Sequence, residues 1–149
     1  MSTLFLAHAL AVGSFYGSVR NAVELLDLST WTWETKTPYP FEEGIFWAPI
    51  INVGDKFVIF GGSNDNIIFN KLSRITAYTP HTDEWTTEGK LLSVRSHAGV
   101  ITIDYDSFLI MGGGTSSSFQ FSSSEKCVYI DDQLECTYQS PTEPWGEYF

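Results

Sequence analysis

The sequence predicts an all-β protein with a repeated architecture. Aromatic residues make up 15% of the 149 residues, and twelve glycines and six prolines interrupt the chain often. Aromatic and β-branched segments that are cut by Gly and Asx turns are typical of strands and hairpins. No stretch of 10 to 15 residues keeps a helical period near 3.6; residues 22–28 (AVELLDL) come closest and are too few. The hydrophobic content of 43% indicates a packed core.

The charge of the chain restricts its partners. Eight basic and eighteen acidic residues give a formal net charge of −10. Such a surface repels phosphate backbones and anionic lipid, so neither nucleic-acid binding nor membrane insertion is expected. The apolar residues 4–12 are similar to a signal peptide with a small-residue cleavage site, but no Lys or Arg precedes them. We expect them to form a strand instead.

A repeat of about fifty residues carries the fold prediction. Residues 57–62 (FVIFGG) match residues 108–113 (FLIMGG) at a shift of 51. Sixteen residues after the second glycine of each copy comes a tyrosine, and seven residues later comes a Trp in one copy and a Cys in the other. Upstream, a Leu and a Trp show the same seven-residue step, and residues 9–14 (ALAVGS) replace the diglycine segment. The repeated positions are Gly61, Gly62, Tyr78 and Trp85, then Gly112, Gly113, Tyr129 and Cys136, with Leu26 and Trp33 upstream.

Each copy is predicted to contain four strands, a to d. In the second copy these are 45–52, 56–60, 74–78 and a strand from 85, with turns at 54–55 and 80–83. In the third copy they are 97–103, 107–111, 126–130 and 134–138, and the first copy lacks strand a. Strand b is nearly continuously apolar, which is typical of burial on both faces. The glycines are expected where a Cβ would clash, and the Tyr and Trp where neighbouring sheets pack.

This pattern resembles the kelch repeat of β-propellers: a hydrophobic strand ending in Gly-Gly, a spaced Tyr, and a Trp about seven residues later. Residues 57–85 are the best copy, and Arg95 and His97 are similar to the start of a kelch blade. The resemblance implies a kelch-type β-propeller fragment of about three four-stranded antiparallel blades in one domain, 1–149. Its parts would be a partial blade at 4–36, blades at 37–88 and 89–140, and a tail or next blade at 141–149.

Three departures from the family pattern stand out. The first copy has Gly-Ser and Leu26, and the third has Cys136 in place of the Trp. Kelch propellers usually carry five to seven blades, and fewer than about four cannot close a ring. We therefore expect a piece of a longer propeller, a truncated product, or self-association that completes the ring, because open ends would expose apolar faces.

The alternative that the resemblance raises is part of an extracellular or oxidase-like carbohydrate-handling propeller, because some kelch propellers, such as the copper enzyme galactose oxidase, are enzymes. His8, His81 and His97 fall at different blade positions, so we expect no metal, no cofactor and no catalytic residue; His97 is expected to be a hydrogen-bond donor at a blade edge. Glu42-Glu43 and Asp131-Asp132 are expected to form a solvated linker and a tight turn. The 112–118 segment has no Lys and opens no helix, so it is not a phosphate loop.

The expected function is therefore a protein-interaction scaffold without catalytic activity. Loops carry function on a rigid framework, and the b–c loops at 15–20, 64–71 and 115–124 are polar with interleaved aromatic residues. The alternative is that these aromatic side chains only cover blade edges. The candidate partner-binding residues are Phe15, Tyr16, Arg20, Asn64, Asp65, Phe69, Phe119 and Phe121.

The two cysteines are predicted to face each other. A two-residue turn at 131–132 would pair 130 with 133 and hence Cys127 with Cys136, at nearly the span that a disulfide needs. The alternative is two reduced thiols, one of them a small core residue. The compartment stays open: cytoplasmic by default, or extracellular if the disulfide forms.

Overall fold

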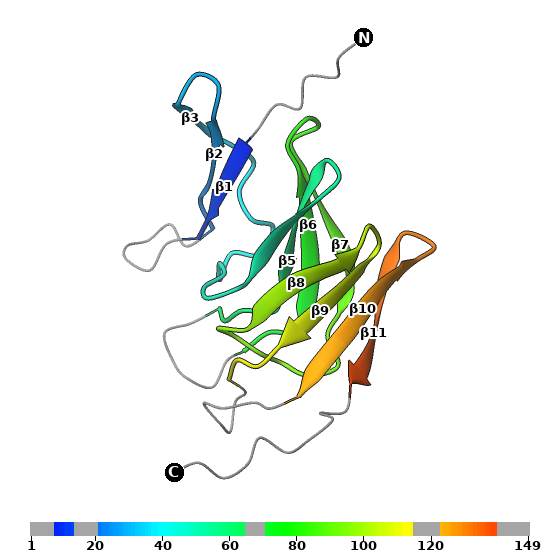
Figure 1. Ribbon diagram of the computed structural model, residues 1–149. Coiled ribbons are helices and arrows are strands. Elements are labelled where there is room, and N and C mark those ends of the chain that lie inside the picture. The colour runs from blue at the N-terminus through cyan, green and yellow to red at the C-terminus, as the bar shows by residue number, and fades with distance from the viewer. Residues whose placement is uncertain (1–7, 14–20, 65–70, 115–122, 140–149) are drawn as a thin grey trace, which may run out of the picture.

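The computed structural model describes residues 8–13, 21–64, 71–114 and 123–139, and every regular element there is a β-strand. The first sheet contains β1 (His8–Val12), β2 (Val23–Asp27) and β3 (Thr32–Thr35) in antiparallel order. It is a separate sheet, drawn in blue in Figure 1. The described residues include no helix long and apolar enough to span a membrane.

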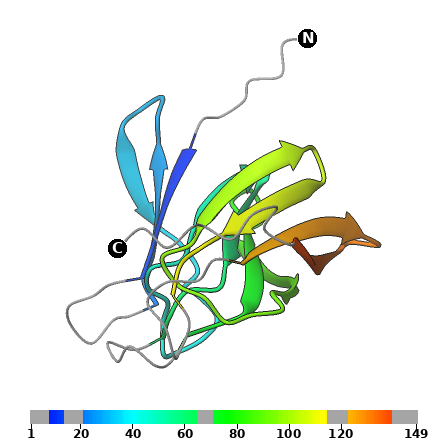
Figure 2. The same cartoon turned by 60° about the horizontal axis from the view of Figure 1, so that its bottom comes forward.

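Two further antiparallel sheets follow in chain order. The second sheet runs β4 (Ile50–Val53), β5 (Lys56–Phe60), β6 (Arg74–Thr79) and β7 (Glu84–Lys90). The third runs β8 (Gly99–Asp104), β9 (Ser107–Met111), β10 (Ser124–Ile130) and β11 (Gln133–Gln139). A parallel bridge between Gly89 and Leu134 joins β7 to β11, so the eight strands form one continuous order. Figure 2 shows the three groups of strands fanning apart.

Strand a begins later in both copies than the sequence predicts. The expected spans were 45–52 and 97–103, whereas β4 starts at Ile50 and β8 at Gly99. The reason is backbone conformation: Trp47 has φ 52° and His97 has φ 56°, which is left-handed and interrupts an extended strand. Phe46 lies outside β4 and pairs with Ser63 in an isolated bridge.

The cores lie between the sheets. Leu25 of the first sheet packs with Phe57 and Tyr78 of the second. Between the second and third sheets, Phe60 and Phe108 belong to a larger cluster of fully or nearly fully buried side chains. That cluster also contains Val58, Ile75, Ala77, Leu91, Ile110, Cys127 and Leu134. Burial between successive sheets therefore supplies most of the apolar packing.

The strand registers correct one assignment made from the repeat. Phe57 pairs with Tyr78, but its counterpart Phe108 pairs with Cys127, so Cys127 occupies the tyrosine position and Tyr129 lies two residues beyond it. The b–c connection of the third copy is two residues shorter, and strand c continues for two residues more before a tighter turn. Tyr78 and Tyr129 are equally far from their diglycines because the shorter connection and the longer strand c of the third copy cancel each other.

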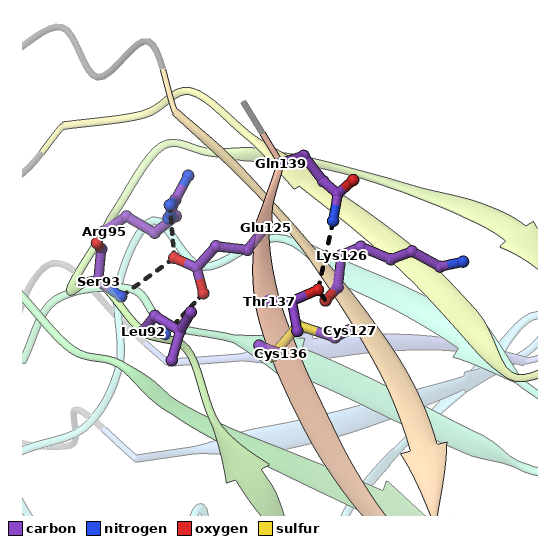
Figure 3. The surroundings of a disulfide bond; sticks show 9 residues. All are labelled: Leu92, Ser93, Arg95, Glu125, Lys126, Cys127, Cys136, Thr137 and Gln139. Atoms are coloured by element: carbon purple, nitrogen blue, oxygen red, sulfur yellow. Dashed lines mark hydrogen bonds and ion pairs between the residues drawn. A yellow bond between two sulfur atoms is a disulfide. The ribbon is translucent and has the colours of Figure 1, made fainter. Parts of the chain in front are cut away.

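The disulfide replaces an aromatic pair at one position of the sheet. Tyr78 lies opposite Trp85, with ring centroids 5.0 Å apart, and the equivalent pair in the third sheet is Cys127 and Cys136. Their sulfur atoms form a disulfide, which Figure 3 shows, with an S–S distance of 2.03 Å in the structure. The turn between them is Asp131-Asp132, with φ of 49° and 62°. Two residues with positive φ are typical of a type I′ hairpin turn, which matches the twist of the strands.

The diglycines stand where backbone segments approach closely. A Cβ at Gly61 would lie 2.5 Å from the carbonyl oxygen of Arg95, and one at Gly113 would lie 2.5 Å from that of Ser96. Both glycines also have left-handed φ values, of 62° and 85°. The connection between β7 and β8 thus passes directly over the ends of two strands, β5 and β9.

A buried ion pair fastens the third sheet to this connection. The guanidinium of Arg95 donates to the carboxylate of Glu125 at 2.6 Å, and both side chains are fully buried. Glu125 also accepts from the backbone N–H groups of Leu92 and Ser93, at 2.6 and 3.1 Å (Figure 3). Arg95 further donates to the carbonyl oxygen of Ser123 at 3.0 Å. Such multiple partners are what a buried charge pair requires.

Candidate functional site

One end of the sheets gathers the segments that connect strand b to c and strand d to a, and we call it the loop face. Its backbone is held by bridges that join Phe46 to Ser63, Ser63 to Lys71, and Ser96 to Gly114. The N–H of Gly62 donates to the carbonyl oxygen of Arg95 at 2.8 Å. These bonds link connections that are far apart in the sequence, so the face is built on a fixed framework.

An exposed aromatic stack occupies this face. The ring of Trp47 lies 4.6 Å from that of His97, with an interplanar angle of 26°. The N–H of His97 donates to the carbonyl oxygen of Trp47 at 2.8 Å, and Nδ1 of His97 lies 3.3 Å from the hydroxyl of Ser96. Trp47 remains 40% exposed. Both stacked residues adopt left-handed φ values, a conformation uncommon for bulky side chains that here positions the two rings together.

A charged cluster lies at the junction of the first and second sheets. Arg74 donates to Glu43 at 3.0 Å, and its guanidinium lies 3.7 Å from the ring centroid of Phe41. Asn64 also donates to Glu43, at 3.5 Å. The backbone N–H of Glu43 itself, followed by Arg74 and Asn64, lowers the pKa of the Glu43 carboxyl. Glu43 is thus an ion-pair partner, not a freely solvated linker residue.

The structure describes only part of the predicted partner-binding set. Asn64 lies on the loop face beside Glu43. The other seven candidates lie outside the described residues: Phe15, Tyr16, Arg20, Asp65, Phe69, Phe119 and Phe121. Sequence reasoning missed Trp47 as the partner of His97. The two residues are fifty positions apart, close to the repeat shift of 51, so aligning the segments before strand a shows that they are equivalent but not that they are in contact.

The three histidines do not form one cluster. His8 lies on β1, His81 in the β6–β7 turn, and His97 in the connection that precedes β8. Within the described ranges, no group of three or more His, Cys, Asp or Glu side chains is placed to hold a metal ion.

Comparison with known proteins identifies sequence relatives. Kelch-like protein 36 of Bos taurus is 28% identical over 131 residues, which are 85% of this chain and 20% of the relative. Kelch-like protein 36 of Rattus norvegicus is 30% identical over 110 residues, which are 71% of this chain and 17% of the relative. The chain thus spans about a fifth of the curated relatives that it matches. No protein-family model matches it.

The fold has a matching solved structure. YjhT, which has a kelch β-propeller fold, superimposes with a TM-score of 0.75 at 15% sequence identity. The match covers 92% of this chain and 50% of YjhT. It confirms the predicted fold class, an all-β piece of a propeller with consecutive antiparallel blades. The relatives and the fold together place the chain in the kelch-repeat family of β-propellers.

Proposed function

We propose that the chain is a non-catalytic kelch-repeat scaffold that binds a partner protein through its loop face. The observation that carries this proposal is the exposed Trp47 stacked on His97. Tryptophan is enriched among the residues that dominate protein interfaces, and a side chain already held in place loses little conformational entropy on binding. The similarity to Kelch-like protein 36 supports a scaffold role.

The charged cluster supports the same role. Arg74 and Asn64 both donate to Glu43, and Arg74 is stacked on Phe41. A polar, internally bonded rim beside an exposed aromatic group is the usual composition of a binding surface. We propose no catalytic step for these groups, because each described polar side chain of the cluster is engaged in holding its neighbours.

The test is affinity capture followed by quantitative binding. Wild type, Trp47→Ala and Tyr105→Ala are used as baits, and Kd is then measured with each purified candidate partner. Tyr105 is an exposed aromatic residue in the β8–β9 turn, at the opposite end of the strands, and serves as the matched control. We expect Trp47→Ala to raise Kd at least tenfold and Tyr105→Ala to leave it unchanged. Equal affinity of all three baits would contradict the assignment of the loop face.

A further inference from the structure

Buried polar side chains gather where the first and second sheets meet. Tyr39 stands in the connection between β3 and β4, Thr76 lies on β6, and each of these residues is 1% exposed. Arg74 lies on β6 two residues before Thr76. Within the part of the chain that the structure describes, the Tyr39 hydroxyl, the Thr76 hydroxyl and Nη1 of Arg74 are buried and have no hydrogen-bond partner. Such atoms are costly in a protein interior unless another group satisfies them.

These three groups lie close to one another. Alternation along β6 puts Arg74 and Thr76 on the side away from Ile75, which packs toward the third sheet. The guanidinium of Arg74 lies on the ring of Phe41, whose centroid is 5.4 Å from that of Tyr39. Burial raises the pKa of Tyr39, whereas the Thr76 hydroxyl and then the Arg74 charge lower it, so both are within reach of the Tyr39 hydroxyl. No hydrogen bond of ordinary geometry joins any two of the three groups.

Tyr39 is held in place by both sheets. Its N–H donates to the carbonyl oxygen of Asn21 at 2.8 Å, and Nδ2 of Asn21 donates to its carbonyl oxygen at 3.3 Å. Asn21 belongs to the segment that leads into β2. The Tyr39 ring packs edge-on against Trp85 of the second sheet, with ring centroids 5.2 Å apart. The hydroxyl would lose this packing if it swung out to solvent, so the group that satisfies it lies between the two sheets.

The charges around this position favour a neutral ligand. The positive charge of Arg74 disfavours a cation. Glu43 accepts from Nη2 of Arg74 at 3.0 Å, so an added anion would meet this carboxylate in a chain of net charge −10. Oδ1 of Asn64, a buried acceptor without a partner among the described residues, lies beside Glu43 and also disfavours an anion.

The groups that need partners define the ligand further. They are one N–H of a guanidinium, which can only donate, and two hydroxyls, which can both donate and accept. A ligand that satisfies all three must therefore accept and donate hydrogen bonds at once. Water does both and is the smallest molecule that can.

We infer that one ordered water molecule is bound between Tyr39, Thr76 and Arg74 and joins the first sheet to the second. Its oxygen accepts from Nη1 of Arg74 and from the Tyr39 hydroxyl, and it donates one hydrogen to Oγ1 of Thr76. About three hydrogen bonds are typical of a buried water. This inference concerns the interior between the sheets and does not rest on the proposed function of the loop face.

The first test is a crystal structure of the chain at a resolution that shows ordered water. We expect a density peak roughly 2.7 to 3.2 Å from the Tyr39 hydroxyl oxygen, from Oγ1 of Thr76 and from Nη1 of Arg74, and we expect it to refine as water. A direct bond between the two hydroxyls, with no water beside them, would overturn the inference. A peak that refines as an ion would do the same.

A double variant tests the same site in solution. The field dependence of water oxygen-17 relaxation measures how many water molecules stay bound for longer than the protein takes to tumble. Tyr39→Phe combined with Thr76→Val nearly keeps both side-chain shapes and removes two of the three bonds. We therefore expect one long-lived water fewer than in the wild type. An unchanged number in the folded double variant would count against the bound water.

The matched control removes the same two kinds of hydroxyl from the surface. Tyr105→Phe combined with Thr102→Val changes exposed residues of the β8–β9 hairpin, where bound water exchanges quickly with solvent. The number of long-lived waters should stay at the wild-type value, and a loss equal to that of the interior variant would overturn the assignment. Circular dichroism shows whether each variant is folded. If the interior double variant is not, Tyr39→Phe alone should shorten the residence time of the water, and an unchanged residence time would contradict the inference.

Discussion

Adding one methyl group at Gly61 should be far more costly than adding it at Gly54. The two glycines have nearly the same backbone conformation, with φ of 62° and 60°. Their surroundings differ: no atom lies within 4 Å of a Cβ at Gly54, whereas a Cβ at Gly61 would lie 2.5 Å from the carbonyl oxygen of Arg95. Gly54→Ala is therefore a control for the left-handed φ and for the reduced entropy of the unfolded chain.

The magnitude follows from the contact. An ordinary Cβ contact begins near 3.4 Å, so the carbonyl of Arg95 would have to move by 3.4 − 2.5, or about 0.9 Å. That carbonyl accepts from the N–H of Gly62 at 2.8 Å and belongs to the residue that carries the buried ion pair, so it does not move freely. We expect Gly54→Ala to lower the free energy of unfolding by about 1 kcal/mol. For Gly61→Ala the expected loss is about 3 kcal/mol, with overpacking supplying the difference.

Urea unfolding measures this difference. Both variants are followed by circular dichroism and tryptophan fluorescence at one protein concentration, so that any association contributes equally. For a chain of this size, the Gly61→Ala melting temperature should fall by about 10 °C, at roughly 3 °C per kcal/mol. Equal losses of unfolding free energy, within about 0.5 kcal/mol, would show that close backbone approach does not explain the glycine.

Three further predictions concern the disulfide, the two ion pairs and the hydrogen-bonded carboxyl group of Asp83. Cys136→Ala should lower the unfolding free energy by on the order of 2 to 3 kcal/mol, the chain-entropy value for a loop of this length. Reductant should destabilise the wild type similarly and leave the variant unchanged; a reductant effect on the variant would contradict this. Glu125→Ala should cost about 3 to 5 kcal/mol, because it leaves the Arg95 charge buried, whereas Glu43→Ala, in a partly exposed ion pair, should cost less than about 1 kcal/mol. Similar losses in these two variants, measured by urea unfolding, would refute the distinction. The pKa of Asp83 is lowered, first by its hydrogen bond from the Tyr78 hydroxyl and then by the N–H of Thr37. A lowered carboxyl pKa contributes stability that is present above the unfolded pKa near 3.8 and is lost as pH falls through the folded pKa. The stability advantage of wild type over Asp83→Asn should therefore decline below about pH 4; an advantage independent of pH from 7 to 2 would argue against it.

The repeat pattern predicted the strands that local sequence determines. Residues 56–60 and 107–111 were expected as strand b, and they are the bounds of β5 and β9. The nearly continuous apolar run indicates where such a strand lies, and the Gly-Gly pair that follows indicates where it ends. The Asp131-Asp132 turn also determined the pairing of β10 with β11, because a two-residue turn sets the register of every residue that follows it.

Tertiary structure decided which residues of different copies are equivalent. Cys127, and not Tyr129, occupies the position of Tyr78, because the pairing of strand c with strand b sets that row. Counting residues from the diglycine cannot detect a shorter loop that is followed by a longer strand. That the disulfide takes the place of an aromatic pair is evident only from the registers in which the strands pair.

The sequence alone therefore determined the strands, their hairpin turns and the repeat, since these depend on residues close together in the chain. It did not determine the stack of Trp47 on His97, the Arg95–Glu125 pair or the Glu43–Arg74 cluster. Each joins residues 30 or more positions apart, and their contact depends on how one sheet packs on the next. Polar and aromatic partners at such separations leave no periodic trace, because nothing in local backbone preference requires them to meet.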